Sequence, residues 1–158
     1  MSLKEFKKKE TIKLKEYRTS YRDNYTFLET YCKKEFNSGN YLDLLSKKTN
    51  LIEQNSREIK EIVEQDYIKS NNYDFKVTPD VQNATDFLRI ELLGMQGKHN
   101  YKKSTERAVY EILQQIRDNL THYGKFEVSN EQFDRNFILI KNASIISSSL
   151  IKILEENG

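Results

Sequence analysis

The sequence predicts an all-α protein made of a few long helices in a single domain, residues 1–158. Glycine (5) and proline (1) are scarce, whereas a fold of many short strands needs more turn-forming residues. Hydrophobic residues make up 37% and charged residues 32% of the chain, which leaves enough Leu, Ile, Phe and Tyr for a core. Apolar residues recur at steps of three and four, the spacing of an amphipathic helix.

The first predicted helix runs from about Leu3 to Phe36. Its apolar and aromatic positions are Ile12, Leu14, Tyr17, Tyr21, Tyr25, Leu28, Tyr31 and Cys32. The segment 37–40 (Asn-Ser-Gly-Asn) is predicted to end this helix, because Gly39 is suited to a positive φ after the helix end. Cys32 is the only cysteine, so the chain forms no intrachain disulfide, and we expect this side chain to be partly buried.

The middle of the chain is less regular. Helical spacing returns between Tyr41 and Ile68, with a break expected near residues 48–50, and is then lost from Ser70 to Asp80. Pro79 pushes the residue before it toward an extended conformation, which favours a loop there. A short helix around residues 87–93 and a connection near residues 97–100 complete this region. We therefore expect a bundle of four to five helices with an irregular insert around residues 70–100.

Two further helices complete the predicted bundle. One runs from about Ser104, a suitable cap, to Thr121; its apolar stripe is Val109, Ile112, Leu113, Ile116 and Leu120. The last runs from about Asn130 to Leu154 and is apolar around most of its circumference, which predicts burial on two sides. The second side would face either a partner subunit, approached closely at the small residues 147–149, or the rest of the same chain.

Charge is distributed unevenly. The net charge is +2, but residues 1–22 contain eight basic and three acidic residues, an excess of +5. This stretch is either a face that attracts phosphate or a solvated helix surface. We expect no apolar run long enough to span a bilayer and no secretion signal near Met1, so the predicted location is the cytoplasm.

The residues best suited to chemistry lie in the segment 116–125, Ile-Arg-Asp-Asn-Leu-Thr-His-Tyr-Gly-Lys. Asp118 and His122 are four apart and therefore neighbours on a helix, where the carboxylate would orient the imidazole. Arg117 offers a planar, permanently charged fork for phosphate. The alternative is that Arg117 and His122 only satisfy carbonyls and carboxylates at a helix end. The second histidine, His99, lies in a predicted loop with no obvious partner.

Such a set can cleave RNA without a metal ion. A histidine can take the proton from a ribose 2′-hydroxyl, or give one to the leaving 5′-oxygen, while the 2′-oxygen attacks phosphorus. The product is a 2′,3′-cyclic phosphate, and DNA is spared because it lacks the hydroxyl. One histidine does not easily act as base and acid in the same step. Two copies of the motif facing each other in a dimer would solve this.

The string around Arg117, Asp118 and His122, followed by Gly124 and Lys125, resembles the HEPN superfamily (higher eukaryotes and prokaryotes nucleotide-binding). That family carries an arginine, a polar residue and then a histidine near the end of a bundle helix. The resemblance implies a HEPN-like up-and-down bundle, and an endoribonuclease that works as a homodimer, here through the C-terminal helix. Many such proteins are toxins of toxin–antitoxin pairs or phage-defence effectors, so an antitoxin protein is a candidate partner.

The resemblance assigns roles residue by residue. Arg117 would bind the scissile phosphate, His122 would act as general acid or base, and Asp118 would orient His122. Asn119, Tyr123 and Lys125 are candidates for RNA contact. The sequence contains no zinc-ligand set and no glycine-rich phosphate loop, so we expect no cofactor and no metal. Two alternatives remain: a non-catalytic module that dimerises and binds a partner protein, RNA or a nucleotide, and a helical scaffold.

Overall fold

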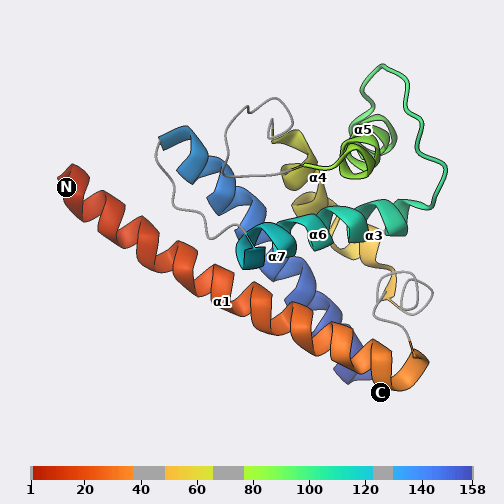
Figure 1. The fold of residues 1–158 in the computed structure, drawn as a ribbon, viewed down its shortest axis with the longest axis horizontal. Coiled ribbons are helices and arrows are strands. Elements are labelled where there is room, and N and C mark those ends of the chain that lie inside the picture. The colour runs from red at the N-terminus through yellow and green to blue at the C-terminus, as the bar shows by residue number, and fades with distance from the viewer. Residues whose placement is uncertain (1, 38–48, 66–76, 123–129, 158) are drawn as a thin grey trace.

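The computed structural model describes residues 2–37, 49–65, 77–122 and 130–157, without the side chains of residues 6–11, 121–122, 130–133 and 157. These residues form helices and no strands, which confirms the predicted all-α class. The helices are α1 (Leu3–Phe36), α3 (Leu51–Gln54), α4 (Ser56–Glu64), α5 (Pro79–Leu93), α6 (Thr105–His122) and α7 (Asn130–Asn157) (Figure 1).

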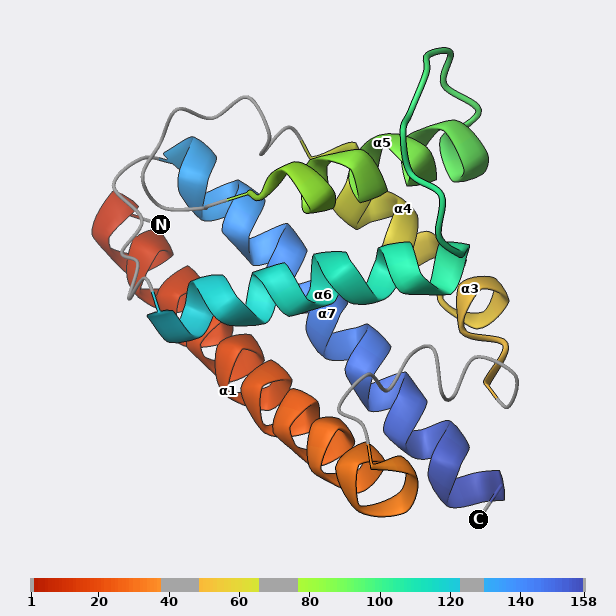
Figure 2. The same ribbon diagram turned by 45° about the vertical axis from the view of Figure 1, so that its right-hand side comes forward.

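The two longest helices, α1 and α7, lie side by side and run in the same direction, so the chain ends near the C-terminal end of α1 (Figures 1 and 2). Helix α4 packs on α7, and α5 packs on α4 and α6. Helix α6 crosses the α1–α7 pair obliquely and contacts both helices (Figure 2). The C-terminal half of α6 therefore lies against the middle of α1.

The ends of α1 follow from local chemistry. Ser2 and Glu5 form a capping box in which each side chain accepts the other residue's backbone N–H. At the other end Asn37 adopts a left-handed conformation (φ 58°) and its N–H bonds the carbonyl of Lys33. Both predicted ends of this helix are confirmed, although Asn37 terminates it and Gly39 lies outside the described residues.

Residues 79–93 correct the predicted irregular insert, because they form the regular helix α5. Pro79 occupies the first turn, where its missing N–H costs nothing, and the Thr78 hydroxyl caps the helix by accepting the N–H of Val81 at 3.3 Å. Gly94 ends the helix with φ 66°. The segment between Gly94 and Ser104 is the irregular part. The predicted break near residues 48–50 is confirmed at Asn50, whose φ is 48°.

Helix α7 is held on two sides by its own chain. On one side the Asn24 side chain of α1 donates to the hydroxyls of Ser147 at 3.1 Å and Ser148 at 2.8 Å. On the other side Asn55, which precedes α4, donates to Ser149 at 3.2 Å. The small residues of α7 thus serve a close approach of helices within one chain, and the predicted dimer contact through this helix stays a prediction.

The apolar character of α7 corrects one expectation from the sequence. The stretch Asp134–Glu156 is long and apolar enough, by length and composition, to cross a membrane, whereas the sequence analysis predicts no such run. Half of its most apolar window is buried inside the protein. This burial is what a central helix of a bundle requires.

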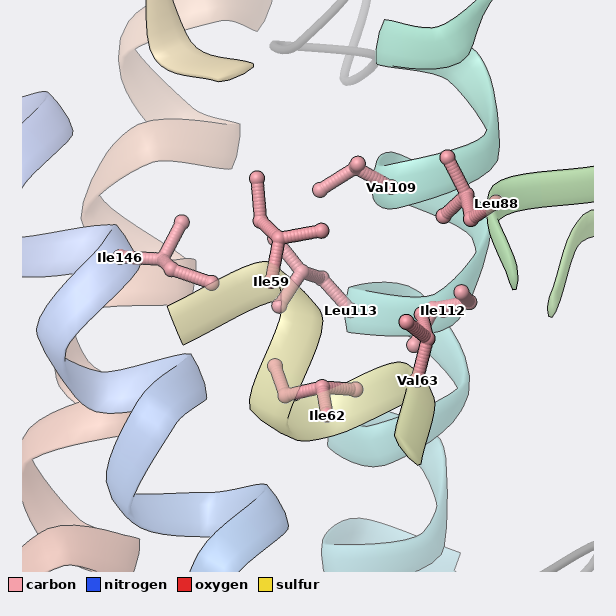
Figure 3. A pocket seen from close by; sticks show the side chains of 8 residues that line it. All are labelled: Ile59, Ile62, Val63, Leu88, Val109, Ile112, Leu113 and Ile146. Carbon is pink, nitrogen blue, oxygen red and sulfur yellow. The ribbon is translucent and has the colours of Figure 1, made fainter. Parts of the chain in front are cut away.

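The core between α4, α5, α6 and α7 is closely packed. Eight aliphatic side chains enclose a void of about 10 Å³ (Figure 3). They are Ile59, Ile62, Val63, Leu88, Val109, Ile112, Leu113 and Ile146. A water molecule needs about that volume together with two or more polar partners, which this lining does not offer. This void is therefore a packing feature and not a ligand site.

Candidate functional site

Helix α6 carries the candidate site near its C-terminal end. The Ser104 hydroxyl accepts the N–H of Arg107 at 3.0 Å and so starts the helix as predicted. Val109, Ile112, Leu113 and Ile116 bury one face of the helix in the core, which fixes its rotation. The Tyr21 hydroxyl donates to the carbonyl of Leu113 and ties α6 to α1 one turn before Arg117.

The Arg117 guanidinium lies over an aromatic ring of α1. Its central carbon is 4.6 Å from the centre of the Tyr25 ring, a cation–π distance. Its Nε is 3.2 Å from a carboxylate oxygen of Asp118, and its Nη2 is 3.8 Å from one of Glu29. The side chain keeps 26% of its surface exposed. Arg117 is therefore fixed by its own chain and still reachable from solvent.

The charge of Arg117 and the neutral state of Tyr25 are both fixed by their surroundings. Burial lowers the pKa of Arg117, but the neighbouring Tyr25, Asp118 and Glu29 outweigh this effect and the pKa is raised. Burial raises the pKa of Tyr25 well above its usual range, Tyr110 raises it further, and Arg117 opposes the rise. Arg117 is thus always cationic and Tyr25 always neutral near pH 7.

Asp118 pairs with Arg117, the residue before it in the chain. The role predicted for Asp118 is to orient His122, and the side chain of His122 lies outside the described residues. Tyr123, Gly124 and Lys125 lie outside them as well. The backbone of His122 is described and forms the last residue of α6.

The helical register separates Arg117 from His122. Five residues along an α-helix correspond to about 140° around the axis and about 7.5 Å along it. Asp118 and His122, four residues apart, share one side of the helix. Positions 117 and 122 therefore lie on different sides of the α6 backbone, which bears on how these residues could act on one phosphate.

Asn119 is placed unfavourably for its predicted RNA contact. Only 3% of its surface is exposed, because the residue lies on the inward side of α6. A buried amide of this kind serves packing and hydrogen bonding inside the chain. In the described chain Asn119 is therefore placed to serve packing inside α6, and its RNA contact stays a prediction.

Tyr25 and Glu29 of α1 contact Arg117, and the sequence alone does not identify them as part of the site. Tyr25 and Glu29 are one turn apart on α1, so their spacing shows that they share a side of that helix. Nothing in the spacing shows that this side meets α6. Only the contact across the two helices identifies them.

His99, predicted to lack a partner, has two. Its Nδ1 accepts the backbone N–H of Tyr101 at 3.2 Å, and its ring lies 4.9 Å from that of Phe87. Among the residues that the structure describes, no three His, Cys, Asp or Glu side chains are grouped to hold a metal ion.

Nothing matched this chain in comparisons with protein-family models, with curated proteins and with solved structures. The fold defines the class as an all-α helical bundle. The chemistry of the candidate site therefore rests on its own residues.

Proposed function

We propose that this protein is a metal-independent endoribonuclease of the HEPN type, which cleaves RNA as a homodimer in the cytoplasm. The observation that carries the proposal is the fixed Arg117 guanidinium, backed by the Tyr25 ring and set five residues before the His122 that ends α6. A cation held in place before substrate arrives stabilises the charge that develops on a phosphorane-like transition state. A role as a toxin or phage-defence effector is part of the same proposal.

The reaction follows from these groups. A neutral His122 removes the proton of a ribose 2′-hydroxyl, and the 2′-oxygen forms a bond to the adjacent phosphorus. The bond from phosphorus to the 5′-oxygen breaks, and a protonated His122 delivers a proton to that oxygen. Arg117 binds the non-bridging oxygens throughout. The products are a 2′,3′-cyclic phosphate and a free 5′-hydroxyl.

A dimer would supply the second histidine that one chain lacks at this site. Base and acid have to act on opposite sides of the phosphorus, whereas one chain offers a single histidine at this site. The roughly 140° between Arg117 and His122 also separates the phosphate-binding group from the proton-transfer group around one helix. Two copies of the end of α6, related by a twofold axis, would bring an arginine of one protomer toward a histidine of the other. Tyr123 and Lys125, just after this end, keep their proposed role as RNA contacts.

A second candidate function is a non-catalytic helical module, in which Arg117 is a structural residue. It is favoured by the two carboxylates that Arg117 meets in its own chain, Asp118 at 3.2 Å and Glu29 at 3.8 Å. In that case the same surface would bind a partner protein, an antitoxin among the candidates, or a nucleotide.

RNA cleavage in EDTA separates these functions. We expect purified protein to cut single-stranded RNA and leave cyclic phosphate ends, and Arg117→Ala and His122→Ala to cut at least about 100-fold more slowly. The chain offers matched controls in His99→Ala, the other histidine, and Arg57→Ala, an exposed arginine of α4. Equal cleavage by wild type and all four variants would indicate a contaminating nuclease and overturn the proposal. Absence of cleavage by wild type would favour the binding module.

A further inference from the structure

A second cationic group lies at the opposite end of α6, in and just before its first turns. The Nζ of Lys103 is 2.8 Å and the Nε of Arg107 is 3.3 Å from the same carboxylate oxygen of Glu111. The Glu111 side chain is only 9% exposed, whereas that of Lys103 is 54% exposed. A buried carboxylate thus holds two cations at the surface of the protein, and we call these three residues the Lys103–Arg107–Glu111 cluster.

The charge of this cluster is not balanced. Two cations and one carboxylate leave +1. The wider segment 98–107 has four basic residues (Lys98, Lys102, Lys103 and Arg107) and one acidic residue (Glu106), so adding Glu111 gives four minus two, or +2. Lys98 and Lys102 are exposed. The surface around the start of α6 therefore attracts anions.

The segment that carries these lysines is held by aromatic packing. Tyr101 stacks on Phe87 of α5 with ring centres 5.2 Å apart, and His99 packs against the edge of the same ring. The Nζ of Lys103 lies 6.0 Å from the centre of the Tyr101 ring. Because Tyr101 is buried, the connection from α5 to α6 is anchored to the body of the protein. An anion meeting these lysines would find them already positioned, which reduces the entropy lost on binding.

Two tyrosines, Tyr110 and Tyr25, connect the cluster to Arg117. The central carbon of the Arg107 guanidinium lies 5.0 Å from the centre of the Tyr110 ring. Tyr110 in turn adjoins Tyr25, the ring beneath Arg117. Both arginines thus lie over buried tyrosines that adjoin one another. The sequence separation of ten residues between Arg107 and Arg117 corresponds to about 15 Å along the helix.

We infer that Lys103 and Arg107 form a second phosphate-binding subsite, for the backbone of an RNA strand whose scissile phosphate lies at Arg117. The inference rests on the proposed function for the position of the cut, and on the contacts of the Lys103–Arg107–Glu111 cluster for the binding itself. A span of about 15 Å covers about four nucleotides of a strand stacked at about 3.4 Å per nucleotide, and fewer of an extended one. Because the subsite binds phosphate, its contribution to affinity depends on the length of the strand and not on its sequence.

Salt-dependent binding tests the subsite without requiring cleavage. The probe is a fluorescent 2′-O-methyl uridine oligonucleotide of about 12 residues, which has no free 2′-hydroxyl and survives an active nuclease. Its affinity for the full chain is measured between about 50 and 200 mM KCl, a range in which each lost phosphate contact reduces the slope of log K against log salt by about 0.7 for a single strand. We expect Arg107→Gln and Lys103→Gln each to reduce the slope by about this amount and to weaken binding several-fold.

The control variants distinguish the effect of a lost charge on the slope from an effect of misfolding. Arg107→Lys retains the cation and should keep the slope near that of wild type, and Arg57→Gln removes the same charge from α4 and should leave it unchanged. Lys103→Gln leaves the contact of Arg107 with Glu111 intact, so it is informative even if Arg107→Gln fails to fold. The subsite would be overturned if the slopes for Arg107→Gln and Lys103→Gln equal the slope for Arg57→Gln. It would also be overturned if the wild-type protein does not bind the oligonucleotide. The expected slope differences in a protein that cleaves no RNA would instead support the subsite and overturn only the nuclease proposal.

Discussion

The Arg117 guanidinium of α6 rests 4.6 Å from the ring centre of Tyr25 on α1, and this contact joins the candidate site to the longest helix of the protein. Tyr25 is almost completely buried, so the ring forms a fixed base on which the cation lies. Such contacts stabilise by about 0.5–2 kcal/mol. They also restrict the positions that a long, flexible arginine side chain can take.

Two substitutions test this contact, one that removes only the hydroxyl of Tyr25 and one that removes its ring. Tyr25→Phe keeps the ring, and we expect it to lower the free energy of unfolding by about 1 kcal/mol through the lost hydroxyl interactions, with RNA cleavage nearly unchanged. Tyr25→Leu removes the ring and should reduce kcat for cleavage at least about tenfold. Urea denaturation and steady-state kinetics measure the two effects. Equal kcat for Tyr25→Leu and Tyr25→Phe would show that the ring does not position Arg117.

Glu29 should compete with RNA for Arg117. Its carboxylate is 3.8 Å from Nη2 of Arg117, at a partly exposed position, and carries the same sign of charge as a phosphate. We expect Glu29→Gln to tighten RNA binding several-fold and to change stability by less than about 1 kcal/mol, because exposed ion pairs contribute little. Glu35→Gln, in the last turn of α1, is the matched control for net charge. Weaker RNA binding by Glu29→Gln in a fluorescence anisotropy titration would contradict this role.

Cys32 should be unreactive in the folded protein. The residue is completely buried, although the sequence predicts only partial burial, and burial raises the pKa of its thiol from 9.0 to about 11. Because the unfolded chain loses this proton first, the corresponding stability is complete below pH 9 and is lost as the pH rises toward about 11. We expect a thiol reagent at about pH 8 to modify Cys32 only in urea. Cys32→Val should flatten the decline of stability between pH 9 and about pH 11, measured by urea denaturation.

Substitutions at Ser147 and Ser148 test whether α7 is packed within one chain. It is fully buried against α1, whereas Ser148, next to it, is exposed. We expect Ser147→Leu to lower the free energy of unfolding by about 1–3 kcal/mol through overpacking, and Ser148→Leu to have a small effect. The measurement is urea denaturation, combined with the molar mass from light scattering. A loss of dimer mass in Ser148→Leu with unchanged monomer stability would place a second subunit on this face instead.

The sequence predicted the long helices well because their signals are local. Both ends of α1 and the start and end of α6 agree with the structure to within about one residue, through periodicity and through caps such as Ser104. The sequence does not predict the first half of helix α5, because Pro79 favours a loop there, although proline is also favoured in the first turn of a helix. The Thr78 hydroxyl, which caps that turn, is the signal that corrects this prediction.

The surroundings of Arg117 could not be predicted because they depend on tertiary contacts. The residues that meet Arg117 from α1 lie about 90 positions earlier in the chain, and helical periodicity does not state which helix a given face will meet. The same limit applied to residues 147–149, whose small side chains suited a second subunit and the same chain equally well. The hydrogen bonds from Asn24 and Asn55 show the contacts of these residues within one chain, and a second subunit on the exposed side at Ser148 stays a prediction.

The proposed mechanism requires attack by a ribose 2′-hydroxyl, and the removal of this one oxygen atom from the RNA tests it most directly. An RNA oligonucleotide is first cut by wild-type protein in EDTA, and the cleavage position is mapped. The same strand is then made with one 2′-deoxynucleotide on the 5′ side of that bond. We predict that wild-type protein no longer cuts there and that His122→Ala cuts neither strand. Continued cleavage at the deoxy position would contradict the mechanism proposed for Arg117 and His122.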